Sequence, residues 1–210
     1  MMKLFFDNIK YCYLPDPGRP ILFRVNRKPE GMSLDEMEDM YWGYSEDNRF
    51  SIPDTKQMYL ATSLDCVSEA TPWEELLKEY NDSTGSCIPF NADELSDYYV
   101  SYIRPLHRLN LLDITEDFGR YVRQGSGGDI TNGSDYEPSK EFSKQCYEQS
   151  KVDGIYYRSA KNPTARNVYL FERSKPKFGK ASVVAREPLV DVIKPMVDVI
   201  AEKVGIEILI

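Results

Sequence analysis

The sequence contains little of the chemistry that builds metal sites and histidine-dependent triads. Its only histidine is His107, and its four cysteines, Cys12, Cys66, Cys87 and Cys146, form no Cys-x-x-Cys pair. A structural zinc site needs closely spaced Cys or His ligands, and a nucleophilic triad of the common type needs a histidine base. We therefore predict reduced structural thiols, no bound metal and no histidine-based triad.

Phosphate-binding glycine patterns are also missing. The sequence has no G-x-x-x-x-G-K-[ST], and no G-x-G-x-x-G follows a predicted strand. The one glycine-rich stretch, GSGGDITNGSDYE at 125–137, is polar and is predicted to be a surface loop. A nucleotide bound by this protein would need charged side chains in place of a glycine-rich backbone cradle.

Long apolar runs and excess positive charge are absent too. The most apolar stretch, PLVDVIKPMVDVIAEKVGIEILI, is interrupted by charges, and few apolar residues precede Asp7. We therefore expect no membrane span and no signal peptide, and place the protein in the cytoplasm. A net charge of −8 opposes direct binding to nucleic acid or to an anionic membrane surface.

What the sequence does contain is typical of a globular domain. Hydrophobic residues make up 41% and aromatic residues 12% of 210 residues, which is enough to build a substantial core. Short β-type runs alternate with helical patterns, and segment 95–103 suits either state. The pattern predicts a mixed α/β or α+β domain with one central sheet system and helices on its faces. Strands are predicted at 20–25, 57–63, 108–115, 154–159, 167–172, 180–186 and 205–210, and helices at 64–80 (broken at Pro72), 116–124, 138–151 and 191–204.

A further helix is predicted in the acidic stretch MSLDEMEDMYW. Ser33 is suited to cap its start, and Met37, Met40 and Tyr41 follow at three- and four-residue spacing. Such a stripe is expected to pack into the core.

Five polar residues near the ends of predicted strands are candidates for function. They are Arg24 in LFRV, Arg49 in NRF, Tyr59 in MYLA, Glu69 in SEA and Ser159 in YYRSAKNP. Each has an ordinary explanation when taken alone, because surface arginines, core tyrosines and solvated glutamates are common.

Together these residues lie in segments that resemble the RES domain family, which is named for its Arg, Glu and Ser. The segments ILFRV, NRF followed by MYLATSLDCVSEA, LNLLDIT and KVDGIYYRSAKNPTARNVYLFE occur in the family's order. One departure is Asn48 in place of a glycine often found before the Arg-Phe pair. The middle between Glu75 and Leu109 matches poorly, and the acidic stretch before Arg49 and the tail after Lys175 lie outside the resemblance, so these regions carry no functional inference. We predict one RES-like domain over residues 1–210, with its core at about 20–175 and a C-terminal extension, 176–210, packed on that core.

The resemblance implies an α+β fold similar to ADP-ribosyltransferases and a role as the toxin of a toxin–antitoxin pair. Members of the family consume NAD by hydrolysis, phosphorolysis or transfer of ADP-ribose to a protein. The resemblance further implies a separate antitoxin, commonly with a helix-turn-helix region. NAD is therefore the expected substrate of this protein.

The five candidates suit this chemistry. Arg24 or Arg49 can bind the pyrophosphate with a forked guanidinium, and an aromatic face such as Tyr59 can stack on the cationic nicotinamide. Glu69 is expected to stabilise the positive charge that develops on the ribose, and Ser159 to orient the ribose or the amide. A protein-directed ADP-ribosyltransferase and a catalytically silent binding module remain the alternatives.

Overall fold

The computed structural model describes most of the predicted strands and one long helix. The described residues are 11–14, 22–37, 40–46, 48–62, 90–91, 96–115, 136–158, 166–194 and 208–209. The strands are β1 (Tyr11–Leu14), β2 (Leu22–Arg27), β3 (Gln57–Ala61), β4 (Phe90–Asn91), β5 (Tyr98–Ile103), β6 (Leu109–Asp113), β7 (Gly154–Arg158), β8 (Arg166–Phe171), β9 (Val183–Pro188) and β10 (Ile208–Leu209). The helices are α3 (Glu137–Glu148), α4 (Leu189–Ile193) and the 3-10 helices η2 (Leu34–Glu36), η5 (Glu172–Lys177) and η6 (Lys180–Ser182).

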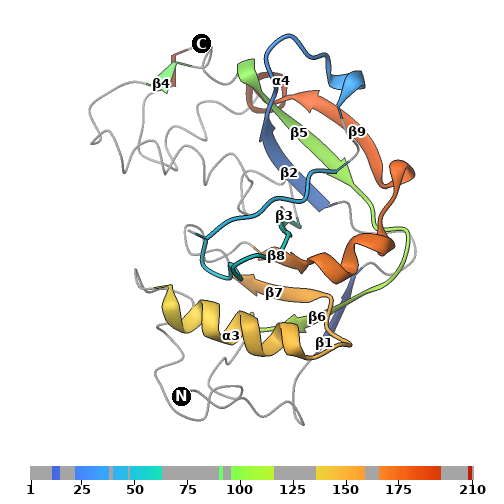
Figure 1. Cartoon of the computed structure of the whole chain (residues 1–210). Coiled ribbons are helices and arrows are strands. Elements are labelled where there is room, and N and C mark those ends of the chain that lie inside the picture. Colours follow the sequence, from blue (N-terminus) through green and yellow to red (C-terminus); the bar gives the residue numbers. More distant parts are fainter. Residues whose placement is uncertain are drawn as a thin grey trace.

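Eight strands form one mixed sheet in the order β1-β6-β7-β8-β3-β2-β5-β9 (Figure 1). The pair β6–β7 is parallel, and its neighbours along the sheet are antiparallel. A parallel pair needs a long crossover connection, and α3 lies in the connection between these two strands. The short strands β4 and β10 form a separate parallel pair. This arrangement confirms the predicted α+β class.

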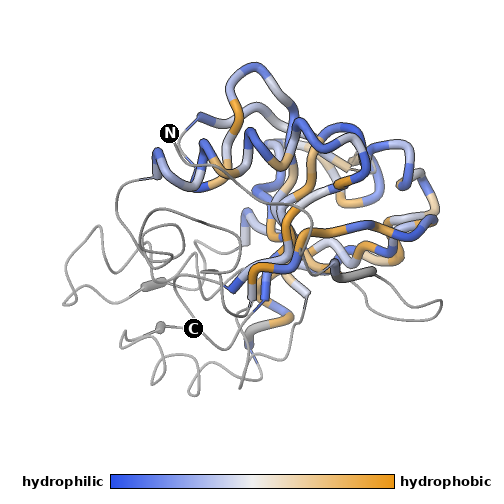
Figure 2. The backbone as a smooth tube through the Cα atoms, turned by 90° about the horizontal axis from the view of Figure 1, so that it is seen from below, coloured by the Kyte–Doolittle hydropathy of each residue, from blue (hydrophilic) through white to orange (hydrophobic). Residues whose placement is uncertain are grey.

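The core lies on both faces of the sheet because successive residues of a strand point to opposite faces. On one face Phe142 and Cys146 of α3 pack with Ile155 and Tyr169 of the sheet. On the other face Leu22, Met58, Leu60, Leu109, Val168 and Leu170 pack with Trp42 from the loop after η2. Figure 2 shows hydrophobic residues along the central strands and hydrophilic ones on the outer turns.

Predicted and observed elements agree best where hydrophobic periodicity is strong. The helix expected at 138–151 is α3, with Phe142 and Cys146 fully buried on one face. Segment 95–103, which the sequence left open, forms β5 from Tyr98, in keeping with its tyrosines and valine. The helix expected at 191–204 begins at Leu189 and is described as far as Ile193. The segments 64–80 and 116–124 lie outside the described residues.

The helix predicted after Ser33 is wrong. The chain forms a single 3-10 turn, η2, closed by Ser33 N–H and Oγ donating to Glu36 Oε2, each at 2.8 Å. Met37 is already extended, and Gly43 then pairs with Gln57 of β3 in an isolated antiparallel bridge. The backbone bonds between Gly43 and Gln57 hold this part of the chain extended, which a continuing helix would not allow. Met37 is buried as expected, but Tyr41 is 66% exposed.

Cys146 agrees with the structural role predicted for the cysteines. Cys146 is a buried free thiol, and burial raises its pKa well above the usual value, which suits a structural role. The side chains of Cys12, Cys66 and Cys87 lie outside the described residues. Within the described ranges, no helix has the length and apolar content needed to cross a bilayer.

Arg173 holds the C-terminal end of α3 against η5. Its guanidinium donates to the carbonyl oxygens of Gln149, at 2.8 Å, and Tyr147, and its central carbon lies 4.3 Å from the Tyr147 ring centroid. A cation that binds the last carbonyls of a helix also opposes the partial negative charge there. Arg173 therefore has a structural role at the C-terminal end of α3.

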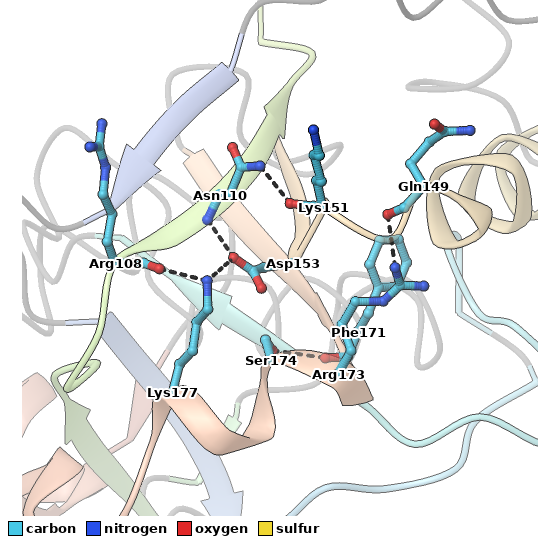
Figure 3. Close-up of polar contacts among 9 residues, drawn as sticks. All are labelled: Arg108, Asn110, Gln149, Lys151, Asp153, Phe171, Arg173, Ser174 and Lys177. Atoms are coloured by element: carbon cyan, nitrogen blue, oxygen red, sulfur yellow. Dashed lines mark hydrogen bonds and ion pairs between the residues drawn. The ribbon is translucent and has the colours of Figure 1, made fainter.

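A buried ion pair fixes the start of β7 (Figure 3). Asp153 Oδ2 accepts from Asn110 N–H at 2.6 Å and from Lys177 Nζ at 2.5 Å, and Lys177 also donates to the Arg108 carbonyl at 2.7 Å. The Asp153 side chain is 8% exposed and that of Lys177 is 31% exposed. This network ties η5 to the strand that leads to Ser159.

We expect Asp153→Ala to lower the free energy of unfolding by about 2–3 kcal/mol. Removing one partner of a buried pair typically costs about 3–5 kcal/mol, and the partial exposure of Lys177 reduces that cost. Lys177→Ala should cost about as much, because it leaves the buried Asp153 carboxylate without its cation, although the carboxylate keeps its bond to the Asn110 amide. Urea unfolding of the two variants beside the wild type measures both values. A loss below about 1 kcal/mol in either variant would contradict this account.

Candidate functional site

Three of the five candidate residues lie in the described part of the chain. Arg24 is in β2, Arg49 is in the turn that precedes β3, and Tyr59 is in β3. Glu69 and Ser159 lie outside the described residues, although Ser159 directly follows the last residue of β7.

Arg24 is half-buried and lines a pocket. Its Nη1 donates to the Tyr41 carbonyl oxygen at 2.7 Å, and its guanidinium carbon lies 5.9 Å from the Tyr41 ring centroid. Burial lowers the pKa of Arg24, and the nearby Tyr99 and Tyr41 oppose that shift. A guanidinium that has lost part of its hydration binds an anion more strongly than one in bulk water.

The pocket around Arg24 has a volume of about 550 Å³. We call it the methionine pocket because Met32, Met37, Met40 and Met58 line it together with Arg24 and Tyr41. Thioether side chains adapt their shape and contact aromatic rings favourably. The pocket combines two arginines, Arg24 and Arg27, with polarisable apolar walls, which suits a ligand that carries both an anionic group and a planar ring.

Arg49 and Tyr59 form a second group beside the N-terminal end of α3. The Arg49 guanidinium carbon lies 5.6 Å from the ring centroid of Tyr136, the residue that precedes α3. The Tyr59 hydroxyl accepts from Phe50 N–H at 3.0 Å, and its ring centroid is 4.8 Å from that of Tyr169. Burial raises the pKa of Tyr59, so its phenol is neutral at physiological pH.

The sheet separates the two arginines. Met58 lines the methionine pocket with Arg24, whereas Tyr59, the next residue of β3, packs against the core that includes α3. Consecutive strand residues point to opposite faces, so Arg24 and Tyr59 lie on opposite faces of the sheet. The structure therefore brings Arg49 and Tyr59 together and places Arg24 apart from them.

Gln57 is a site residue that the sequence reasoning missed. It is 3% exposed and shares a face of β3 with Tyr59, and its side-chain amide hydrogen-bonds to the loop that carries Arg49. The sequence feature that could have identified Gln57 is an amide residue at the start of an otherwise apolar strand. A buried amide needs partners for its donors and acceptors, and that need points to a polar network.

The mixed sheet and the crossover helix define an α+β domain, and a pocket lined by Arg24 opens beside strand β2. The family model of the RES domain matches residues 21–192, which is most of the chain. The protein therefore belongs to the RES domain family, and the predicted resemblance is confirmed. The match includes β9 and reaches into α4, beyond the core expected from sequence. No curated protein matches the chain.

Proposed function

We propose that this protein is an NAD-consuming toxin that breaks the bond between nicotinamide and ribose by hydrolysis or phosphorolysis. Membership of the RES family supports an NAD-related role. The observation that carries the proposal is the methionine pocket, which a half-buried Arg24 lines together with Arg27 and apolar side chains. Its volume of about 550 Å³ falls within the roughly 300–1,000 Å³ typical of small-molecule sites.

Arg24 is assigned to the pyrophosphate. Its forked guanidinium matches two phosphate oxygens, and the pocket around it is partly shielded from water. The methionine walls and the Tyr41 ring suit the adenine or the nicotinamide. Binding of NAD would replace or share the donor that now serves the Tyr41 carbonyl. This assignment chooses between the two arginines that the sequence left open.

Arg49 and Tyr59 are assigned to the reacting end of NAD, together with Glu69 and Ser159. Arg24 and Tyr59 lie on opposite faces of the sheet. One extended NAD molecule would therefore contact both residues only if it passed around the end of β3. This arrangement predicts separate kinetic effects. Loss of Arg24 should act mainly on KM, because the pyrophosphate does not react, and loss of Arg49 should act mainly on kcat.

The proposed reaction changes charge at the ribose. The bond from ribose C1′ to the pyridinium nitrogen breaks with its electron pair going to that nitrogen, and positive charge develops on the ribose. Glu69, as a carboxylate, stabilises this charge, and Ser159 fixes the orientation of the ribose or the amide. Water or inorganic phosphate then bonds to C1′ and loses a proton to solvent.

Two alternatives use the same fold. A mono-ADP-ribosyltransferase would present a protein nucleophile to the same ribose carbon, so labelled protein would appear instead of free ADP-ribose. A catalytically silent module would bind without consuming NAD. We further propose that a separate antitoxin, with a helix-turn-helix region, neutralises the protein, and that no metal takes part.

The test is NAD loss and nicotinamide release by the purified protein, with and without phosphate. Arg24→Ala should raise KM by about 10- to 100-fold, because a charge-assisted bond contributes about 1.5–3 kcal/mol. Arg24→Lys keeps the positive charge but loses the forked guanidinium, so its KM should lie between those of the wild type and Arg24→Ala. Arg104→Ala removes the same charge from an exposed position after β5 and serves as the matched control.

The outcomes separate the candidate functions. NAD loss that depends on Arg24 and not on Arg104 supports the proposal. Transfer of label to protein with little free ADP-ribose would favour the transferase. No NAD loss and no transfer from folded protein would rule out both enzymes and leave the silent module.

A further inference from the structure

The Gln57 side chain has a complete set of hydrogen bonds inside the protein. Its Oε1 accepts from the Tyr169 hydroxyl at 2.5 Å and from Ile52 N–H at 3.4 Å. Its Nε2 donates to the Ser45 carbonyl at 2.7 Å and to Ser51 Oγ at 3.2 Å. An amide has two donors and can accept two bonds, so each capacity is used here.

These partners surround Arg49 in the sequence. Ser45 precedes Arg49 by four residues, and Ser51 and Ile52 follow it by two and three. Between them, Phe50 N–H is held by the Tyr59 hydroxyl. Gln57 and Tyr59 of β3 therefore hydrogen-bond the turn that carries Arg49. Tyr169 of β8 in turn donates a hydrogen bond to Gln57.

Alternative residues would not replace Gln57. A leucine has a similar size but would leave the Ser45 carbonyl and Ile52 N–H without this partner. A glutamate could accept from Tyr169 and Ile52 but would offer no amide donors to Ser45 and Ser51. Buried polar networks that are fully satisfied specify one local arrangement, and partly satisfied ones lose it.

We propose that Gln57 is a positioning residue that sets the Arg49 turn for the reaction with NAD. It acts through Ser45, Ser51 and Ile52 and does not itself contact the substrate. The inference rests on the proposed function, since the reaction it serves is the one proposed above. A small displacement of a positioned group can cost up to about a hundredfold in rate.

The first measurement is the steady-state kinetics of NAD consumption. Gln57→Leu should lower kcat tenfold or more with KM little changed, which is the behaviour assigned to Arg49. The kcat of Gln57→Glu should lie between those of the wild type and Gln57→Leu. In an Arg49→Ala background, Gln57→Leu should have little further effect, because residues that act as a unit are not additive.

Controls separate positioning from loss of stability. Arg173→Ala removes the support of α3 and is expected to lower the melting temperature without changing kcat. If Gln57→Leu does not fold, Ser51→Ala and Tyr169→Phe each remove one of the four bonds from a folded protein, and each should lower kcat by a smaller factor. Full additivity of Gln57→Leu with Arg49→Ala, or a kcat loss no larger than that of Arg173→Ala, would overturn the inference.

The second measurement does not depend on NAD. Limited trypsin digestion followed by mass spectrometry gives the rate of cleavage between Arg49 and Phe50. Gln57→Leu should raise this rate at least tenfold over the wild type, and Arg173→Ala should not. Equal rates in the two variants would overturn the anchoring role. A wild type that consumes no NAD would reject the proposed function, and the cleavage rates would then judge the anchoring by themselves.

Discussion

Gly154→Ala is expected to prevent the formation of the native sheet. A Cβ atom at this position would overlap the Tyr169 carbonyl oxygen and lie 3.1 Å from Leu170 Cα, and both atoms belong to the backbone of β8. Side chains can rotate away from such a contact, but the backbone of a paired central strand cannot without losing its ladder bonds. We expect a loss of more than about 4 kcal/mol in the free energy of unfolding, because a clash of this kind belongs with the most severe single substitutions.

The measurement is urea unfolding followed by circular dichroism, beside a second Gly→Ala variant. A Cβ on Gly179 would meet only Leu106 Cδ1, at 3.2 Å, and the Leu106 side chain is half-exposed and free to rotate. Gly179→Ala should therefore change stability by about 1 kcal/mol or less. Comparable stability of the two variants would show that β7 and β8 can separate locally at low cost.

Glu69→Gln is expected to abolish most NAD consumption. The variant keeps the size of the side chain and removes the charge that we assign to the stabilisation of the ribose in the transition state. Losing one preorganised electrostatic group typically lowers kcat by about a hundred- to a thousandfold. The measurement is nicotinamide release under saturating NAD, with toxicity in cells as a second readout.

The matched control is Glu148→Gln at the exposed end of α3, which removes the same charge from a solvated position. It should retain full activity. If Glu69→Gln retained wild-type kcat, Glu69 would not be the catalytic carboxylate. If both variants lost activity equally, the effect would come from net charge and not from the site.

Local sequence patterns predicted most of the described elements. Phe142 and Cys146 at helical spacing predicted α3, and apolar runs such as QMYLA and NVYLF predicted β3 and β8. These predictions succeed because an element that is buried on one or both faces has a regular spacing of apolar residues, and this spacing is visible in the local sequence. No strand was predicted before residue 20, but β1 lies there and pairs with β6 about a hundred residues later. No local pattern reports such a distant partner.

The helix predicted after Ser33 failed for a related reason. The spacing of Met37, Met40 and Tyr41 fits a helical stripe, but the bridge between Gly43 and Gln57 holds the chain extended. The methionines became walls of a pocket rather than one face of a helix. Hydrogen bonding to a strand elsewhere in the sequence outweighed the local preference.

The sequence by itself determined the family, the α+β class, and the residue types suited to an anionic substrate, because each of these depends on local motifs and composition. Tertiary structure decided that Arg24 and Tyr59 face opposite sides of the sheet, that the methionines surround Arg24, and that Gln57 anchors the Arg49 turn. These facts depend on strand pairing and on contacts between distant segments. The energy of those contacts depends on which surfaces meet in the folded protein. Local sequence patterns do not show which distant segments will meet.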